Sequence, residues 1–276
     1  MAIKIIKASG LIENFDENKV AFSLHQAGVS IAGVAKVMAF LNTKLQDNMT
    51  TNQMHDMVKN YLQEHEMIVQ ATNYGLKRAV MLLGPSGYPF EKFFARILNL
   101  KGYRTEVGTI ISGRCVKHEV DIDAQKENLH YLVECKFHNA PGNKTDIQAA
   151  LYTYARFLDI RAALTEQAEH QSQFHQCWLV TNTKVSKDAV DYAKCLNINL
   201  ISWTYPHHGN LREMILESRL HPVTSLNLGQ REQTLIQRGI VTCSDLGDAL
   251  KSNQVSDIFS NKERDDLLDR IKTISV

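Results

Sequence analysis

The chain has 276 residues, of which 44% are hydrophobic and 22% are charged, and its formal net charge is +1. This length suits two or three domains of an ordinary globular protein. The near-zero net charge excludes a globally basic nucleic-acid binder, so a surface for DNA would have to be local, and residues 92–117 are its best candidate. No apolar run approaches the roughly 20 residues of a membrane span, and the N-terminus lacks a signal-peptide pattern. We therefore expect a cytoplasmic protein without a membrane partner.

The five cysteines are scattered along the chain and form no Cys-x-x-Cys pair. This pattern argues against a zinc site or a disulfide framework and fits a reducing compartment. We expect the cysteines to be small core residues.

Residues 1–83 are predicted to form a mainly helical first domain. Two short strand-like pieces flank Ser9-Gly10, which is a natural turn. The helical spacing of apolar residues then predicts four helices, over about 17–27, 31–45, 53–64 and 67–83. Asp16 precedes the first of them, and Thr50-Thr51 is a suitable N-cap for the third.

The cluster Gly84-Pro85-Ser86-Gly87 is the clearest linker in the chain and begins a second domain, residues 84–205. Its order of helix, strands and then alternating helix and strand predicts an α/β domain with a mixed sheet flanked by helices. The predicted helices cover 90–100, 145–164 and 187–196. The predicted strands cover 106–111, 116–124, 129–137, 177–181 and 199–203. Residues 125–128 are interpreted as a four-residue hairpin loop that joins Ala124 to Leu129.

Residues 206–276 are predicted to form a third, small helical domain. Two apolar helices within 226–250 are separated by Gly239-Ile240-Val241-Thr242. This part loosely resembles a helix-hairpin-helix, but the tight Gly-x-Gly turn of that motif is missing. We favour an ordinary helical interaction domain over a DNA clamp.

The hairpin of strands 116–124 and 129–137 carries the residues with a catalytic pattern. Side chains alternate along a strand, so Glu134 and Lys136 project to the same face. With a four-residue loop, Asp121 lies near Leu132 and diagonal to Glu134. Hydrolysis of a phosphodiester needs a hard cation held by oxygen ligands and a second positive charge near the reacting phosphate. Two carboxylates and a lysine on one surface meet that need.

The Glu-x-Lys triplet alone is weak, because about one is expected by chance in a chain of this length. Its alternative interpretation is an exposed strand with a surface ion pair worth less than ~1 kcal/mol. The prediction depends on its surroundings: an apolar strand, an acidic residue at hairpin distance, and Glu91 on the preceding helix.

Residues 87–137 resemble the catalytic core of the Mrr-like restriction endonucleases, a branch of the PD-(D/E)xK superfamily. The matching pieces are Gly87-Tyr88-Pro89-Phe90-Glu91, Lys101-Gly102-Tyr103, His118-Glu119-Val120-Asp121-Ile122 and Val133-Glu134-Cys135-Lys136-Phe137. The resemblance implies that Asp121 and Glu134 bind Mg²⁺ or Mn²⁺, that Lys136 orients or activates the water, and that Glu91 supports the metal site. It also implies a DNA substrate, and the double-strand cutting of such nucleases implies a homodimer.

The next helix provides candidate contacts to DNA. Gln148, Tyr152 and Arg156 are four residues apart and share one helix face, with Lys144 one turn earlier. This face either meets a phosphate backbone, with arginine as a bidentate donor, or is an ordinary solvated surface. Both interpretations stay open.

Residues 3–83 resemble the ATP-cone, a nucleotide-sensing module of ribonucleotide reductases and of a repressor of their genes. The matching pieces are Lys7 to Gly10, Glu13, Phe15-Asp16 to Lys19, and Thr51 to His55. The resemblance implies that Lys7 and Lys19 contact the phosphates of ATP or dATP, and that Glu13 and Thr51 hydrogen-bond the nucleotide. Where the family usually has Lys-Arg-Asp-Gly, this chain has Lys7-Ala8-Ser9-Gly10, which removes a phosphate donor. A degenerate cone that mediates only contacts between chains is the alternative.

These features predict a metal-dependent DNA endonuclease, nucleotide-regulated through its first domain, in restriction, defence or repair. A non-catalytic, nucleotide-responsive regulator that binds DNA or protein is the rival hypothesis. The enzyme is favoured because a binding protein has no need of Asp121, Glu134 and Lys136 together.

Overall fold

The structure is a computed structural model that describes residues 3–7, 9–166 and 174–275. The chain forms two compact units, one from Met1–Arg78 with Phe259–Val276 and the other from Ala79–Ile258. None of the helices in these described ranges has both the length and the apolar character needed to cross a lipid bilayer. The fold class predicted from the sequence is confirmed, since each unit shows the expected kind of architecture.

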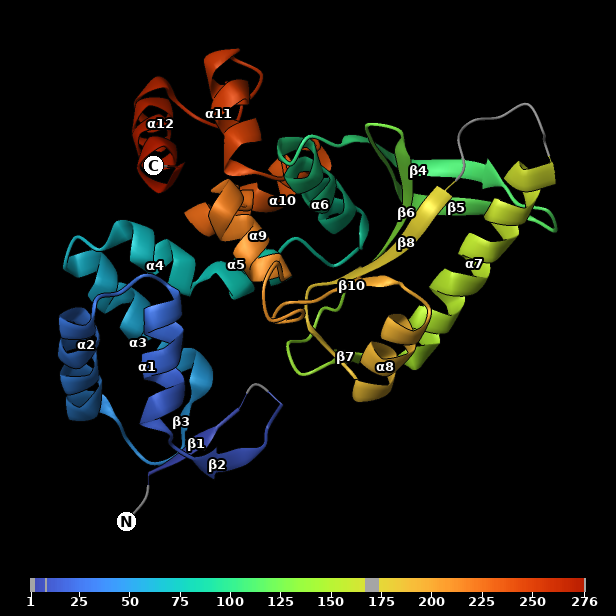
Figure 1. The fold of residues 1–276 in the computed structure, drawn as a ribbon. Coiled ribbons are helices and arrows are strands. Elements are labelled where there is room, and N and C mark those ends of the chain that lie inside the picture. The colour runs from blue at the N-terminus through green and yellow to red at the C-terminus, as the bar shows by residue number, and fades with distance from the viewer. Residues whose placement is uncertain (1–2, 8, 167–173, 276) are drawn as a thin grey trace. The chain divides into compact units, whose positions relative to one another are not determined.

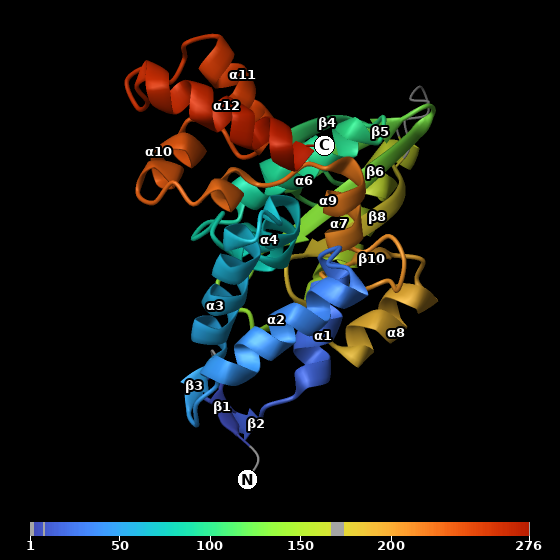
Figure 2. The same ribbon diagram turned by 90° about the vertical axis from the view of Figure 1, so that its left-hand side faces the viewer.

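The first unit combines a small sheet with a helical bundle. Its strands β1 (Lys4–Ile6), β2 (Ile12–Asn14) and β3 (Met49–Thr50) lie in the order β2-β1-β3. The helices are α1 (Glu17–Gln26), α2 (Ile31–Lys44), α3 (Thr51–Glu64), α4 (Ile68–Tyr74) and α12 (Asn261–Ser275). Helix α2 contacts both α1 and α3, as Figure 2 shows. Leu24, Val37, Leu41, Val58 and Leu62 are fully buried among these helices and form the core of the unit.

Local signals position the helix starts of the first unit. Asp16 caps α1, and the side chain of Thr50 caps α3 in a reciprocal capping box with Gln53. The single helix predicted over 67–83 is wrong, because α4 ends at Tyr74 and a separate helix α5 (Leu76–Met81) follows after Gly75. Gly75 has an ordinary right-handed φ of −79°, so no left-handed glycine marks this break, and the apolar spacing alone overlooks it.

The second unit is built around a five-stranded mixed sheet of order β10-β8-β6-β5-β4. Strands β4 (Arg104–Ser112), β5 (Lys117–Lys126) and β6 (Leu129–Lys136) pair antiparallel, whereas β6, β8 (Phe174–Thr181) and β10 (Asn199–Ile201) pair parallel. A two-stranded sheet of β7 (Lys144–Thr145) and β9 (Lys184–Val185) lies beside it.

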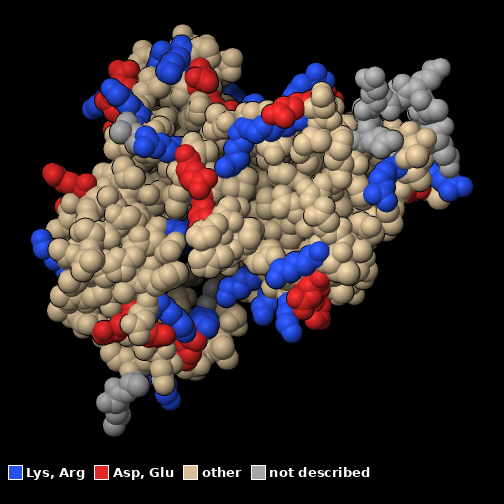
Figure 3. Space-filling model, viewed as in Figure 1, with Lys and Arg blue, Asp and Glu red and all other residues tan. Residues whose placement is uncertain are grey.

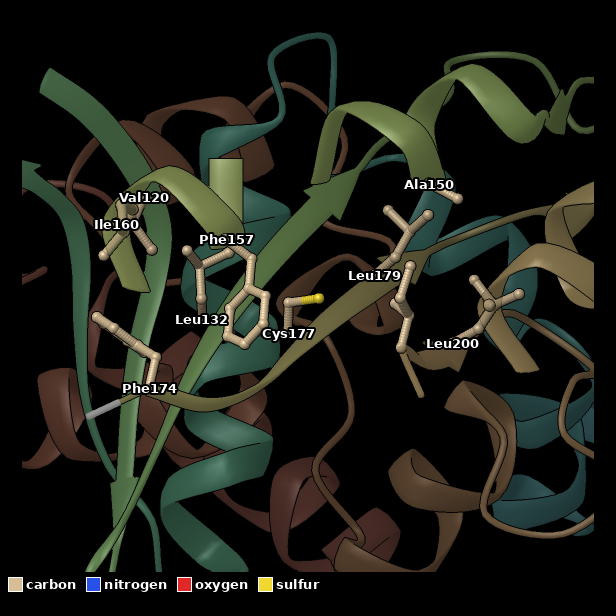
Figure 4. Close-up of a cluster of buried hydrophobic side chains, with 11 residues drawn as sticks. Val120, Leu132, Ala150, Phe157, Ile160, Phe174, Cys177, Leu179 and Leu200 are labelled. Atoms are coloured by element: carbon tan, nitrogen blue, oxygen red, sulfur yellow. The ribbon is translucent and has the colours of Figure 1, made fainter. Parts of the chain in front are cut away.

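Two long helices cover this sheet. Helix α6 (Tyr88–Leu100) packs on β4 and β5, and α7 (Ile147–Glu166) packs on β4, β6 and β8 (Figure 1). Figure 4 shows the core beneath α7, where Phe157 lies beside Leu132 and Cys177 of the sheet, Ile160 lies beside Val120, and Ala150 lies beside Leu179. These side chains are nearly or fully buried. Helix α8 (Lys187–Cys195) joins β8 to β10 and completes the predicted strand–helix–strand unit.

The helical segment after Pro206 does not stand alone as one domain. It contains α9 (Leu211–Ser218), a 3-10 helix (Val223–Leu226), α10 (Arg231–Gln237) and α11 (Cys243–Lys251), all of which belong to the second unit. The hydroxyl of Thr224 donates to the carbonyl of Ala79 at 2.6 Å, and Arg96 pairs with Asp245 at 3.2 Å. The structure therefore divides 206–276 between the two units, whereas the sequence pattern predicts a separate domain there.

Basic and acidic side chains are both scattered over the described part of the face drawn in Figure 3, among largely uncharged surface. This distribution agrees with the formal net charge of +1. Of the cysteines, Cys135, Cys177 and Cys243 are buried as expected, whereas Cys115 and Cys195 are exposed.

Candidate active site

The β5–β6 hairpin sets the two predicted metal ligands side by side. Lys126 pairs with Leu129 across a two-residue turn, and the pairing of the two strands extends to Ile122 and Val133, the residues next to Asp121 and Glu134. The four-residue loop predicted from the sequence is therefore wrong, and so is the position of Asp121 beside Leu132. The correction moves Asp121 closer to Glu134 than the sequence pattern predicts.

Asp121 lies half-buried in β5 and is fixed by the backbone of the neighbouring strand. Its Oδ2 accepts a hydrogen bond from the N–H of Cys135 at 2.7 Å. Burial raises the pKa of Asp121 above its ordinary value, while the Cys135 N–H and the Arg156 charge act in the opposite direction. Glu119 adds to the rise and Lys136 opposes it. The carboxyl is thus held in place within a field of several nearby charges.

Glu134 is the more buried of the two carboxylates, with a side chain that is 17% exposed. Its Oε2 accepts from Nη1 of Arg156 in α7, and Nη2 of the same guanidinium donates to the hydroxyl of Tyr152. Burial raises the pKa of Glu134 to about 7. The negative charges of Asp121 and Glu91 add to this rise, and the Arg156 charge opposes it.

Glu91 supplies a third carboxylate from the first turn of α6. Burial raises the pKa of Glu91 to about 7, and the charges of Asp121 and Glu119 add to the rise. Gly87 leaves room for this side chain, since a Cβ on Gly87 would lie only 3.2 Å from Oε1 of Glu91. The start of α6 is therefore shaped around the acidic group.

Lys136 is exposed at the end of β6, and its charge acts on both Asp121 and Glu134. The structure thus brings together Asp121, Glu134, Lys136 and Glu91. Their catalytic roles remain predictions.

The donor set of this site suits Mg²⁺. Within the described part of the chain, no group of three or more His, Cys, Asp or Glu side chains is placed to hold a metal ion. Mg²⁺ does not require such a group, because proteins commonly bind it through one or two carboxylates while waters and substrate phosphates fill the other positions. Asp121 and Glu134 provide two partly buried carboxylates whose pKa values are raised mainly by burial, with the repulsion of Asp121 adding to the rise at Glu134. A divalent cation would relieve that repulsion.

The predicted DNA-contact face is only partly present as a helix surface. Lys144 is exposed but belongs to β7, and Gln148 is exposed in the first turn of α7. Tyr152 is 56% exposed, whereas Arg156 is 9% exposed and is engaged by Glu134. Arg156 therefore belongs to the acidic site rather than to a solvated helix face.

The first unit contains a cavity of ≈ 200 Å³ at the position predicted for a nucleotide. Glu13, Lys19 and Thr51 line it, together with His55 and Tyr74, whose rings stack at 4.8 Å. Burial lowers the pKa of His55 and raises the pKa of Tyr74 to about 12. Both rings are consequently uncharged near neutral pH and offer an apolar wall to the cavity.

Glu13 links the two lysines predicted to contact phosphates. Its Oε2 pairs with Lys7 at 2.6 Å and its Oε1 with Lys19 at 3.5 Å. The hydrogen bond from Lys7 lowers the pKa of Glu13. Glu13, Lys19 and Thr51 thus line one cavity, and Lys7 is paired with Glu13 of that lining. Ala8 lies outside the described residues.

Comparison with known proteins identifies both units. Residues 82–205 match the restriction endonuclease family of Mrr-like catalytic domains, and residues 3–80 match the ATP cone domain. An uncharacterized protein of Archaeoglobus fulgidus is 39% identical over 154 residues, which are 55% of this chain and 82% of that protein. The chain belongs to the Mrr-like restriction endonuclease family and carries an N-terminal ATP-cone domain. The suspected resemblances are confirmed.

A solved structure of a protein of unknown function supports the family fold. It is 32% identical, with a TM-score of 0.56, over 69% of this chain and 98% of that chain. A restriction endonuclease domain indicates a nuclease. The relatives themselves carry no stated substrate, so the chemistry of this member has to be argued from its own residues.

Two features of this endonuclease domain escape the sequence pattern. The charge of Glu119 raises the pKa of both Asp121 and Glu91. Glu119 lies two residues before Asp121 on the same strand, and this spacing is the sequence signal that could identify it. The contact of Arg156 with Glu134 has no local signal, because the two residues lie on a helix and a strand whose packing is set by tertiary structure.

Proposed function

We propose that this protein is a metal-dependent endodeoxyribonuclease whose active site is centred on Asp121 and Glu134. The observation that carries the proposal is the placement of these two carboxylates on adjacent strands, with Lys136 beside them and Glu91 on α6. A surface that only binds DNA gains nothing from several buried carboxylates, since they repel phosphates. A hydrolytic site that uses a cation does require them.

Asp121 and Glu134 are the residues that would hold Mg²⁺ or Mn²⁺. When bound, such an ion lowers the pKa of a water molecule and neutralises charge that develops on the phosphate. Lys136 is exposed and carries three N–H donors, so it would orient the attacking water or stabilise the pentacoordinate phosphorus of the transition state. Glu91 holds negative charge next to Asp121 and supports the position of the cation. By analogy with the family, the product ends carry a 5′-phosphate, and cutting of both strands would use two copies of the chain.

For the cone, we propose that ATP or dATP occupies the cavity lined by Glu13, Lys19 and Thr51. Lys7 and Lys19 would turn from Glu13 to the phosphates, and Glu13 and Thr51 would hydrogen-bond the nucleotide. This cavity also supports the second candidate function, a non-catalytic regulator that responds to a nucleotide. Control of the nuclease would require the nucleotide to bind two states of the protein with different affinity.

A plasmid-cleavage assay tests the nuclease proposal. Purified full-length protein with Mg²⁺ or Mn²⁺ should convert supercoiled plasmid to open-circular and linear forms, and a chelator should stop the reaction. Modified and unmodified plasmids should both be offered. If metal-loaded protein leaves supercoiled, linear and single-stranded DNA of both kinds intact, the regulator should replace the enzyme as the account of this chain.

A further inference from the structure

Arg156 is an unusual side chain, because it is a buried arginine with an unused donor. It is 9% exposed, and its guanidinium lies 4.5 Å from the centre of the Tyr152 ring. Nη1 pairs with Glu134 and Nη2 donates to the Tyr152 hydroxyl. The Nε–H is buried and has no hydrogen-bond partner among the described residues. Buried donors without acceptors are rare and costly, so this one points to an acceptor that arrives with a ligand.

The position of Arg156 also conflicts with metal binding in its present arrangement. Nη1 of Arg156 pairs with Oε2 of Glu134. Glu134 is one of the two carboxylates that would bind the cation. A guanidinium and a divalent cation repel one another and compete for the same oxygen. The ion pair therefore neutralises Glu134 while the site has no substrate.

Phosphate is the ligand chemistry that fits this guanidinium. The planar fork of arginine presents Nε–H and Nη–H together, which matches two oxygens of a phosphate. DNA would bring such a phosphate to the cation site. Tyr152, which contacts the guanidinium, is 56% exposed, so the guanidinium lies close to solvent on the side of Tyr152.

We propose that Arg156 is a positioning residue. Its guanidinium pairs with Glu134 in the absence of DNA and pairs with a DNA phosphate instead when substrate binds. The proposal rests on the proposed nuclease function. In the absence of DNA, Arg156 holds Glu134 and weakens metal binding. When a DNA phosphate binds the Arg156 guanidinium, Glu134 loses its ion pair with Arg156 and can bind the cation. Metal and DNA then bind cooperatively, because each favours the same arrangement of Glu134 and Arg156. The device keeps the metal site incomplete until DNA is present.

Calorimetric titration of Mn²⁺ into the full-length protein without DNA tests the first half of this exchange. Arg156→Met should bind Mn²⁺ about tenfold more tightly than wild type, since a charge-assisted competitor for Glu134 is lost. Arg156→Lys keeps a positive charge without the planar fork and should shift the affinity less. The matched control is Arg161→Met, which removes an exposed arginine that lies over the Phe157 ring of the same helix. It should leave Mn²⁺ affinity unchanged.

The second half is tested by repeating the titration with saturating duplex DNA in a Lys136→Met background, which keeps both carboxylates while suppressing cleavage. DNA should raise Mn²⁺ affinity about tenfold or more when Arg156 is present and by much less in the Arg156→Met and Arg156→Lys double variants. This loss of coupling is a readout that a purely structural role of Arg156 would not produce.

The outcomes separate this inference from the proposed function. If Asp121→Ala binds Mn²⁺ as well as wild type does, or if neither wild type nor Arg156→Met binds Mn²⁺ with or without DNA, the metal site itself is wrong and the exchange is wrong with it. If Asp121→Ala loses binding but Arg156→Met binds as wild type does or more weakly, the nuclease site stands and the exchange is refuted. Should Arg156→Met fail to fold, Arg156→Lys decides: unchanged coupling of metal and DNA in that variant overturns the proposal.

Discussion

At the scale of single residues, the acidic site holds negative charge that the protein only partly neutralises. Burial raises the pKa of both Glu91 and Glu134 to about 7, and mutual repulsion within the acidic group adds to the rise. Because the folded chain binds these protons more tightly than the unfolded chain, the free energy of unfolding falls as pH rises from about 4.5 to about 7. Above that window these two groups contribute no further change.

Replacement of Glu91 by glutamine should reduce this pH dependence in metal-free protein. Glu91→Gln removes one of the titrating groups and one of the charges that act on Asp121 and Glu134. Relative to wild type, the variant should gain stability as pH rises from about 4.5 to about 7, by on the order of 1 kcal/mol once solvent screening is allowed for. Denaturant unfolding in a chelating buffer at several pH values measures the difference.

The control for this experiment is Glu106→Gln, since Glu106 is exposed on β4 and its charge is not among the causes of the raised pKa values of Glu91, Asp121 and Glu134. The free energy of unfolding of that variant should depend on pH in the same way as that of wild type. The interpretation of charge in this site would be contradicted if the free energy of unfolding of Glu91→Gln had the same pH dependence as that of wild type. It would also be contradicted if the variant lost stability relative to wild type as pH rises.

The sequence predicts the identity of the candidate site residues better than their contacts. Asp121, Glu134, Lys136 and Glu91 can be selected from strand alternation and resemblance, and the structure gathers them. Arg156 is expected on a DNA-facing surface and instead holds Glu134. Spacing along a helix shows which side chains share a face, but it does not show which strand packs against that face.

At the scale of elements, the β5–β6 hairpin shows why the pairing register of two strands cannot be inferred from the alternation of side chains along each strand. Side chains on a strand repeat every two residues, so a shift by two residues leaves every side chain on its original face. The predicted four-residue loop and the observed Glu127-Asn128 turn differ by such a shift. No Asn-Gly or Asp-Gly pair marks the turn, so the sequence lacks the signal that fixes its length.

The backbone of this turn predicts a stabilising substitution. Glu127 has a φ of 55°, in the left-handed region that disfavours most side chains but that asparagine tolerates. Glu127→Asn should raise the free energy of unfolding by about 0.5–1 kcal/mol, as measured by denaturant unfolding. Glu106→Asn, on the neighbouring strand with an ordinary φ, should give no gain. Equal or lower stability of Glu127→Asn would show that the turn is not strained.

At the scale of the whole molecule, the two ends of the chain meet in the ATP-cone unit. Helix α12 packs on α4, and its buried side chains Leu267, Ile271 and Ile274 follow helical spacing. The sequence shows the apolar stripe of α12 but not its partner, because a contact between segments nearly 200 residues apart leaves no local pattern. A fragment of residues 1–83 would lack this helix, so nucleotide binding should be measured on the full chain.

Calorimetry with ATP and dATP on the full chain tests the cone. We expect binding in the micromolar to millimolar range, or roughly −4 to −8 kcal/mol. Lys19→Ala should weaken it about tenfold, because a charge-assisted hydrogen bond worth ~1.5–3 kcal/mol is lost. Lys36→Ala, an exposed lysine of α2 outside the cavity, is the matched control and should bind as wild type does. No heat at millimolar nucleotide would leave the cone a contact module.

Metal-dependent hydrolysis by Asp121 and Glu134 can be tested with one pair of proteins. The most direct measurement compares wild type with Asp121→Asn for plasmid cleavage in Mg²⁺ and for DNA affinity in chelator. Asp121→Asn preserves shape while removing the charge that binds the cation, so cleavage should fall by at least about a hundredfold while DNA affinity stays within a few-fold. Cleavage by Asp121→Asn at the wild-type rate, or by wild type in chelator, would contradict the account.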